Sequence, residues 1–304
     1  MGEKLLMKVC GHEIRIHGRL IRIGRLEADG FLFLEDPEEM LNGLRRCGTR
    51  VDLFTFVQKL KEITPKYPYP TEWDDFAAVP ISTFDHWWTE QIGFKARNKA
   101  KQAEKKGVVI REVPFDAALV KGIWEIYNES PVRQGRRFSH FGKDLETVYR
   151  EEATFLDRSV FIGAFLGGSL IGFIKLVADE TGTQAATMNI LSMVSQRDKA
   201  PTNALIARAV RWCSEQKISF LVYSRFSYGG KGQSTMIDFK ERNGFQKVDV
   251  PRYYVPLTHL GRAAFHLGLH HRFVDRLPRS VVERIRDVRA AWYERKFQTA
   301  KESV

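Results

Sequence analysis

The stretch SVFIGAFLGGSLIGFIKLVADETGTQAATMNILSMV, residues 159–194, decides the fold. Two apolar runs, Val160 to Leu166 and Leu170 to Ala178, flank Gly167-Gly168, a dipeptide that suits a two-residue hairpin turn. A third apolar run, Ala185 to Val194, follows after a polar interval. Three apolar runs joined by short turns predict an antiparallel β-meander.

The sequence on either side of the meander predicts further alternation of helices and strands. Leu205, Ala209 and Trp212 recur at helical spacing, which indicates a helix with a broad apolar stripe. The other predicted elements are a strand at Val108 to Val113, helices at Asp116 to Asn128 and Asp144 to Leu156, a buried strand at Phe220 to Tyr223, a short helix ending at Asn243-Gly244, and two short strands, Gln246 to Val250 and Arg252 to Pro256.

This order of elements, together with two motifs, resembles the GNAT superfamily of N-acyltransferases over roughly residues 108–256. The motifs are RDKAPTNALI, residues 197–206, at the start of the central helix, and FKERNGF, residues 239–245, before the penultimate strand. The resemblance implies an α/β (α+β) chain with the GNAT fold, a mixed and mostly antiparallel sheet flanked by helices.

A second resemblance lies just upstream. FKARNKAKQAEKKGVVIREV, residues 94–113, is similar to the RN-x-x-x-x-A-x-x-x-G-V segment of FemAB-like transferases, GNAT relatives that use aminoacyl-tRNA in place of CoA. Most of it falls in a helix predicted from Phe84 to Lys106, which Ser82 or Thr83 would cap and Gly107 would end. The second half of this helix is basic: Lys95, Arg97, Lys99, Lys101, Lys105 and Lys106. This basic face is either a solvated surface or a contact for the phosphates of RNA, which here would be tRNA.

The chain divides into three predicted regions. Residues 1–83 are expected to form an N-terminal α/β lobe, in which Asp36-Pro37 starts a helix. Residues 84–256 carry the basic helix and the GNAT-like domain, and residues 257–304 form a basic helical tail. The tail either packs on the domain or makes a peripheral contact with a membrane. His266 and His270 stand four residues apart, but no acidic or sulfur ligand is near them in the sequence, so no metal site is predicted.

Composition restricts the partners and the compartment. The net charge is +11, from 48 lysines and arginines against 37 aspartates and glutamates, which favours an anionic partner such as a nucleotide cofactor, RNA or an acidic membrane. Three unclustered cysteines fit a reducing compartment, and the N-terminus lacks the pattern of a signal peptide. The expected location is therefore the cytoplasm.

The GNAT resemblance implies a donor site at the start of the central helix. GNAT enzymes bind the acyl-CoA pyrophosphate on backbone N–H groups of a loop with the pattern [Q/R]-x-x-G-x-[G/A]. Arg197 matches this pattern, Ala200 and Thr202 replace its small residues, and Pro201 removes one N–H. The strand from Met188 to Leu191 would polarise the thioester carbonyl through its N–H groups. With acetyl-CoA or another acyl-CoA as donor, the binding residues would be Ile190, Leu191, Met193, Arg197, Lys199, Ala200, Thr202 and Asn203.

The loop from Glu129 to Lys143 corresponds to the acceptor side of GNAT enzymes. It is long, basic and interleaved with aromatic residues, and it either contacts the acceptor or is a solvated loop. The substrate-binding residues implied by the resemblance are Arg133, Arg136, Arg137, Phe138 and Phe141. Two neighbouring arginines would suit a carboxylate or phosphate on a small-molecule or peptide amine.

The resemblance also assigns the proton-transfer groups. Many GNAT enzymes have a tyrosine acid where this chain has Phe239, and a phenyl ring donates no proton. Tyr228 is the expected substitute, and Glu129, His140 or water is the expected general base. Three functions remain open: acyl transfer from acyl-CoA to an amine by direct attack, FemAB-like transfer from aminoacyl-tRNA or another carrier, and a non-catalytic GNAT-like binding module.

Overall fold

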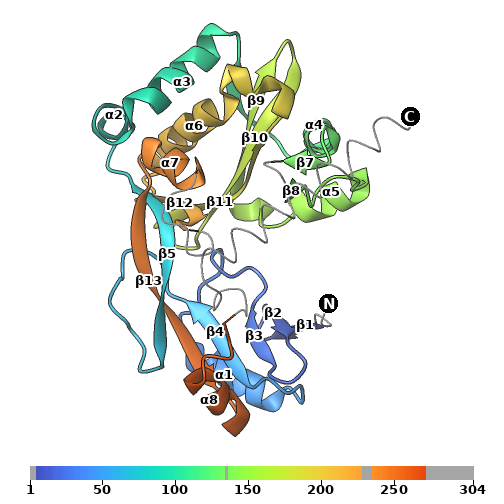
Figure 1. Ribbon diagram of the computed structural model, residues 1–304, viewed down its shortest axis with the longest axis vertical. Helices are drawn as coiled ribbons and strands as arrows, with labels where there is room; N and C mark the ends of the chain where they lie inside the picture. Colours follow the sequence, from blue (N-terminus) through green and yellow to red (C-terminus); the bar gives the residue numbers. More distant parts are fainter. Residues whose placement is uncertain (1–4, 134–135, 228–234, 272–304) are drawn as a thin grey trace. The chain divides into compact units, whose positions relative to one another are not determined.

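The computed structural model describes residues 5–133, 136–227 and 235–271 (Figure 1). The chain forms two units. Unit 1 comprises Met1–Ala77, Ser224–Gly230 and Lys247–Arg276, and unit 2 comprises Ala78–Tyr223, Lys231–Gln246 and Leu277–Val304. The predicted region boundaries at residues 83 and 256 stay a prediction.

Unit 1 is built on a small mixed sheet. β1 (Leu5–Val9), β2 (His12–His17) and β3 (Ile23–Leu26) are antiparallel neighbours, β4 (Leu53–Val57) pairs in parallel with β3, and β13 (Gln246–Pro256) pairs antiparallel with β4. The apolar core of this unit includes Phe54, Phe56 and Tyr253, which are at most 1% exposed.

Two helices complete unit 1. α1 (Pro37–Arg46) begins as predicted, because the Asp36 side chain accepts a hydrogen bond from the Glu39 N–H and proline occupies the first turn. α1 packs Met40 and Leu41 into the core. α8 (His259–His266) starts at Thr258, whose side chain accepts from the Gly261 N–H. The rest of the predicted tail, residues 272–304, lies outside the described residues.

The sheet of unit 2 contains the predicted meander. β9 (Ser159–Leu166), β10 (Ser169–Ala178) and β11 (Gln184–Ser192) are antiparallel neighbours, β6 (Val109–Val113) pairs antiparallel with β9, and β12 (Phe220–Arg225) pairs in parallel with β11. Gly167 and Gly168 form the turn with φ values of 57° and 85°, in the left-handed region that glycine favours. The predicted meander is thus confirmed.

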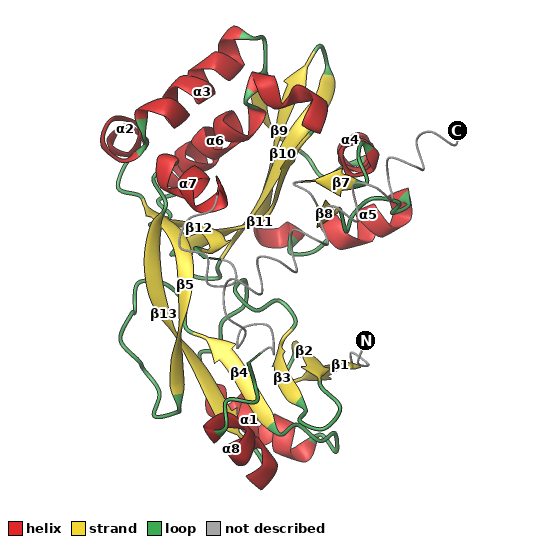
Figure 2. Cartoon of the chain, viewed as in Figure 1, coloured by secondary structure: helices red, strands yellow, loops and turns green. Residues whose placement is uncertain are grey.

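Helices cover both faces of this sheet (Figure 2). α3 (Phe94–Lys105), α6 (Pro201–Glu215) and α7 (Thr235–Arg242) lie on one side, and α4 (Ala117–Asn128) and α5 (Leu145–Glu152) lie on the other (Figure 1). From β6 to β13 the elements follow the predicted order, apart from a short strand pair between α4 and α5 and the joining of the last two predicted strands into one. The predicted fold class, a mixed and mostly antiparallel sheet flanked by helices, is therefore confirmed. The remaining elements are β5 (Thr71–Pro80), β7 (Val132–Arg133), β8 (Arg136–Arg137), α2 (Phe84–His86), and the short helical turns η1 (Trp87–Gln91), η2 (Leu156–Arg158) and η3 (Val194–Lys199).

Two predicted elements are wrong in detail. The helix predicted from Phe84 to Lys106 is interrupted at Ile92-Gly93, where the Gly93 N–H donates to the Arg242 carbonyl and the Trp87 ring nitrogen donates to the Asn243 carbonyl. These contacts with the end of α7 take the place of helical hydrogen bonds. The two strands predicted around Pro251 are one strand, β13, whose pairing with β4 begins only at Arg252. Within the described ranges, no helix is long and apolar enough to cross a membrane.

Candidate functional site

The candidate site is centred on the point in unit 2 where β11 loses its pairing with β12. The two strands pair only from Gln184 to Ala186, opposite Phe220 to Val222. β11 continues to Ser192 and stays paired with β10, with a shift of register at Met188. Among the described residues, those from Met188 to Ser192 are half-buried and have a neighbouring strand, β10, on one side only.

The Glu129 carboxylate accepts hydrogen bonds from backbone N–H groups at the start of η3, immediately after β11. It accepts hydrogen bonds from the Val194 N–H (2.6 Å), the Ser195 N–H (2.9 Å) and the Ser195 hydroxyl (2.7 Å). The Arg133 guanidinium lies 3.4 Å from the same carboxylate. Burial opposes ionisation of Glu129, but these hydrogen bonds and Arg133 outweigh it and lower the pKa of the carboxyl. A carboxylate held in this way is a poor general base.

Two further N–H groups of the loop have partners within it. The Ala200 N–H donates to the Arg197 carbonyl, the Asn203 N–H donates to the Ala200 carbonyl, and Pro201 has no N–H. Thr202 lies in the first turn of α6, where N–H groups have no acceptor within the helix. Ala200 has a φ of 53°, so it adopts the left-handed conformation expected of the glycine that it replaces. The loop therefore has a left-handed turn where the resemblance implies glycine, and the N–H groups of Ala200 and Asn203 donate within the loop.

Several side chains predicted to bind the donor contact other parts of unit 2 instead. Thr202 Oγ1 lies 3.1 Å from Ser192 Oγ, and the Asn203 amide donates to the side chain of Asn243. Lys199 Nζ lies 3.3 Å from Asp198, which also pairs with Lys106. Arg197 is exposed, whereas Ile190, Leu191 and Met193 are half-buried.

The acceptor loop divides into internal and exposed residues. Arg133 donates to the carbonyls of Ser192 (2.7 Å) and Ile126 (2.6 Å) and stacks on Phe138. These two predicted substrate-binding residues therefore hold the loop against β11 and α4. Arg136, Arg137 and Phe141 are exposed and remain available to a ligand.

His140 belongs to the internal group. Its ring lies 4.3 Å from the Tyr127 ring, and burial followed by the charge of Lys143 lowers its pKa, so the imidazole is neutral at pH 7. Lys143 Nζ lies 3.1 Å from His140 Nδ1. Because an ammonium can only donate, Nδ1 accepts and the proton of the ring is on Nε2. His140 in this state offers a ligand a hydrogen-bond donor and no basic nitrogen.

A largely buried polar cluster, none of whose residues was predicted as a site residue, lies beside the part of β11 that pairs with β10 but not with β12. We call Tyr127, Glu152, Lys175 and Asn189 the Glu152 cluster. Glu152 Oε1 accepts from the Tyr127 hydroxyl (2.8 Å) and the Asn189 amide (2.6 Å), while Oε2 is buried without a hydrogen bond from any described residue. Burial raises the pKa of Glu152 despite these hydrogen bonds.

Lys175 connects the cluster to the end of α5. Its Nζ donates to the carbonyls of Glu152 and Thr154, each at 2.7 Å, and to Thr154 Oγ1 at 3.1 Å. Burial lowers the pKa of Lys175 to about 8. The sequence contains a signal for this residue, because a lysine in the middle of the apolar run SLIGFIKLVA must find partners or face water. No comparable signal marks Glu152.

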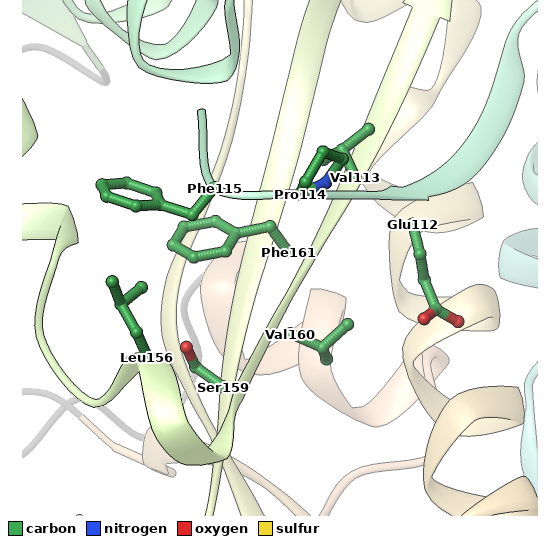
Figure 3. Close-up of a pocket in the computed structure, with 8 residues that line it drawn as sticks. All are labelled: Glu112, Val113, Pro114, Phe115, Leu156, Ser159, Val160 and Phe161. Atoms are coloured by element: carbon green, nitrogen blue, oxygen red, sulfur yellow. The ribbon is translucent and has the colours of Figure 1, made fainter. Parts of the chain in front are cut away.

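A pocket of about 380 Å³ lies elsewhere in unit 2, beside the edge strand β6 and the start of β9 (Figure 3). The Phe115 and Phe161 rings, 5.3 Å apart, are part of its wall. The other lining residues are Glu112, Val113, Pro114, Leu156, Ser159 and Val160. No residue predicted for the donor or acceptor site is among them.

The predicted acid cannot be placed, because Tyr228 lies outside the described residues. Phe239, at the position where many GNAT enzymes carry the acid, lies on α7 with its ring 6.4 Å from the Tyr223 ring. Tyr223 is half-buried near the end of β12. The described residues thus bring Glu129, Arg133 and His140 together, and their predicted roles stay predictions.

Comparison with known proteins relates the chain to others by fold. No family model matches it, and no curated protein matches it. The C-terminal domain of a protein described as lysylphosphatidylglycerol synthetase from Agrobacterium fabrum has a TM-score of 0.56 at 13% identity, over 87% of this chain and 88% of that chain. The corresponding values for L-PGS from Bacillus licheniformis are 0.54 and 15%, over 87% and 88%. FemX has a TM-score of 0.51 at 11% identity, over 88% and 90%. The predicted GNAT and FemAB-like resemblance is confirmed at the level of the fold.

Proposed function

We propose that the chain is an aminoacyltransferase of the FemAB-like kind, which takes its group from aminoacyl-tRNA and transfers it to an amine. The amine attacks the ester carbonyl, an amide forms, the bond to the tRNA 3′ oxygen breaks, and that oxygen gains the proton that the amine loses. The neighbours named as lysylphosphatidylglycerol synthetase and FemX support a transferase of this general kind.

The observation that carries the proposal is the contact of Glu129 with Val194 and Ser195. A carboxylate at this position puts negative charge beside the loop on which GNAT enzymes bind the acyl-CoA pyrophosphate. Bringing a second anion close to it would cost Coulomb energy in a partly buried setting. A donor that does not rely on this loop avoids that cost, and by the FemAB-like resemblance tRNA is such a donor.

The exposed face of α3 supports an RNA partner. Ala96, Ala100 and Ala103 are the buried residues of this helix, whereas Lys95, Lys99, Lys101 and Lys105 are exposed. Four ammonium groups on one short helix suit the closely spaced phosphates of a folded RNA. We place the acceptor at the exposed part of the loop from Glu129 to Lys143. There Arg136, Arg137 and Phe141 would contact a small-molecule or peptide amine.

The test measures binding of total uncharged tRNA by fluorescence anisotropy at two salt concentrations. We expect replacement of Lys95, Lys99, Lys101 and Lys105 by Gln to weaken binding and to reduce the slope of log K against log salt by up to about 4, roughly one for each lost phosphate contact. A variant with the same change in charge elsewhere, at Arg45, Arg46, Lys121 and Arg150, is the control. Equal affinity of the two variants would contradict the role of α3.

Transfer from acyl-CoA is the competing function, and the left-handed turn at Ala200 favours it. Isothermal titration with acetyl-CoA and with free CoA separates the two. We expect no binding in the micromolar range. Micromolar binding that Arg197→Ala/Lys199→Ala abolishes would replace the tRNA proposal with acyl-CoA as donor. Failure to bind either tRNA or CoA would favour a non-catalytic binding module.

A further inference from the structure

Three potential metal ligands converge in unit 1, away from the candidate transferase site. Glu72 lies on β5, and His270 and His271 follow α8. The Nε2 atom of His270 lies 2.8 Å from Glu72 Oε1, and the Nε2 atom of His271 lies 3.1 Å from the same oxygen. Their three ligand atoms all lie within 4.8 Å of one another. One carboxylate oxygen and two imidazole nitrogens thus surround a common point.

Packing fixes the position of the central ligand. The His270 side chain is only 2% exposed, its ring stacks on Phe265 at 5.0 Å with an interplanar angle of 20°, and it lies 4.6 Å from the Tyr254 ring. The His271 ring lies 4.0 Å from the His270 ring. Because aromatic neighbours hold His270 in place, little side-chain entropy remains to be lost when its Nε2 binds an ion.

Among the described residues, the His270 ring makes its hydrogen-bonding contact through Nε2, with Glu72 Oε1. Its Nδ1 is buried, and no described residue donates a hydrogen bond to it. A donor at Nδ1 would have kept the proton of the neutral ring on Nε2 and blocked coordination there. Without a cation, the Nε2–H of His270 donates to the Glu72 carboxylate. A bound cation would replace that proton between the two groups, with the ring proton then on Nδ1.

We propose that Glu72, His270 and His271 bind one divalent transition-metal ion, with Zn²⁺ the best match to two imidazoles and a carboxylate. Three protein ligands leave one position of a tetrahedral ion to water. The 32% and 44% exposure of the Glu72 and His271 side chains gives the ion a route from solvent. The ion would tie β5 to the segment after α8, within unit 1.

The sequence alone does not indicate this site, because its carboxylate ligand is far from its histidines along the chain. Glu72 precedes His270 by 198 residues, and only the fold brings the two together. The ligands from this segment are His270 and His271. His266, which stands four residues before His270, is not one of them. His266 is exposed and serves as the matched control.

The experiment uses the full chain without an affinity tag, treated with a chelator and titrated with Zn²⁺ by calorimetry, with bound zinc counted after dialysis. We expect one equivalent in the unaltered protein. Glu72→Gln, which keeps the shape of the side chain, and His271→Ala are each expected to weaken binding by more than about tenfold, because loss of even an outer partner of a metal ligand costs that much. His266→Ala is expected to bind like the unaltered protein.

A thermal melt separates binding from misfolding. Zn²⁺ is expected to raise the midpoint of the unaltered protein and of His266→Ala, and to leave that of Glu72→Gln unchanged. The proposal is overturned if the unaltered protein retains no zinc, or if Glu72→Gln and His271→Ala bind it as tightly as His266→Ala does. In that case the three side chains form only a hydrogen-bonded group.

Discussion

Glu129 accepts a 2.6 Å hydrogen bond from the Val194 N–H, although 65 residues separate them in the chain. The contact ties the end of α4 to the start of η3, immediately beyond β11. It also weighs against the predicted role of Glu129 as general base, because a carboxylate whose pKa is lowered by hydrogen bonds takes up a proton less readily. In the described structure, the Glu129 side chain fixes the position of the backbone at Val194 and Ser195.

Glu129→Gln is expected to lower the free energy of unfolding at pH 7 by about 1–3 kcal/mol, because the charged acceptor of two backbone N–H groups is lost. The lowered pKa predicts a pH dependence as well. The stabilisation by Glu129 is present above the unfolded pKa near 4.5 and is lost as pH falls through the lower folded value. Urea unfolding at pH 4 and pH 7 checks both statements. Glu125→Gln, at an exposed carboxylate of α4, should change stability by less than about 0.5 kcal/mol. An equal effect of the two substitutions would contradict the prediction.

Glu152→Gln is expected to be tolerated much better than Glu152→Ala. Gln retains an oxygen that accepts from Tyr127 and Asn189, whereas Ala leaves the buried Tyr127 hydroxyl and the half-buried Asn189 amide without this acceptor, at a cost of about 2–4 kcal/mol. Because the folded pKa is raised, the wild-type carboxyl contributes most below about pH 4.5 and loses that contribution as pH rises through the folded value. The stability advantage of the wild type over Glu152→Gln should therefore shrink with rising pH. A constant difference from pH 4.5 to pH 9 in urea unfolding would argue against a raised pKa.

Lys175→Met tests the buried lysine. The folded pKa of about 8 lies below the ordinary lysine pKa of 10.5, so the unfolded chain binds more protons between these values. Wild-type stability should accordingly rise with pH in this window relative to the variant, by at most about 1.4 kcal/mol per pH unit. At pH 7 the variant loses three hydrogen bonds of Lys175 but avoids the burial of a charge. Parallel pH profiles of the two proteins would show that Lys175 keeps an ordinary pKa.

Gly261→Ala is expected to destabilise unit 1 by about 2–4 kcal/mol or to prevent its folding. A Cβ at this position would lie 1.7 Å from the Asp52 carbonyl oxygen, and a backbone atom cannot rotate away as a side chain can. Arg262→Ala, at the adjacent exposed position, should change stability by less than about 0.5 kcal/mol. Thermal unfolding followed by circular dichroism compares them. If Gly261→Ala melts with the wild type, α8 does not approach the Asp52 carbonyl as closely as described.

Local patterns predict the elements of this chain well, and contacts between distant segments explain what they miss. Gly167-Gly168 and Asp36-Pro37 specify their turn and helix start through the conformations of a few adjacent residues. The interruption of the helix at Ile92-Gly93 involves contacts with Arg242 and Asn243, about 150 residues later, and no local signal reports it.

The same distinction applies to the candidate site. The motif around Arg197 correctly indicates a turn at the head of α6, but the carboxylate beside the loop comes from α4. Glu152 is one of two adjacent glutamates at the end of α5, and only folding buries it against Tyr127 and Asn189. Lys175 is different, since its apolar surroundings in the sequence already mark it as unusual.

The pairing of β4 with β13 has a consequence for how the protein is made. Every residue of β4 is buried, and its partner in the register Leu53↔Pro256 is translated roughly 200 residues later. At a synthesis rate of about 5–20 residues per second, one edge of this apolar strand leaves the ribosome about 10–40 s before its neighbour exists. Nascent chains carrying β4 therefore depend on chaperones or on early pairing with β3 to avoid aggregation during this interval.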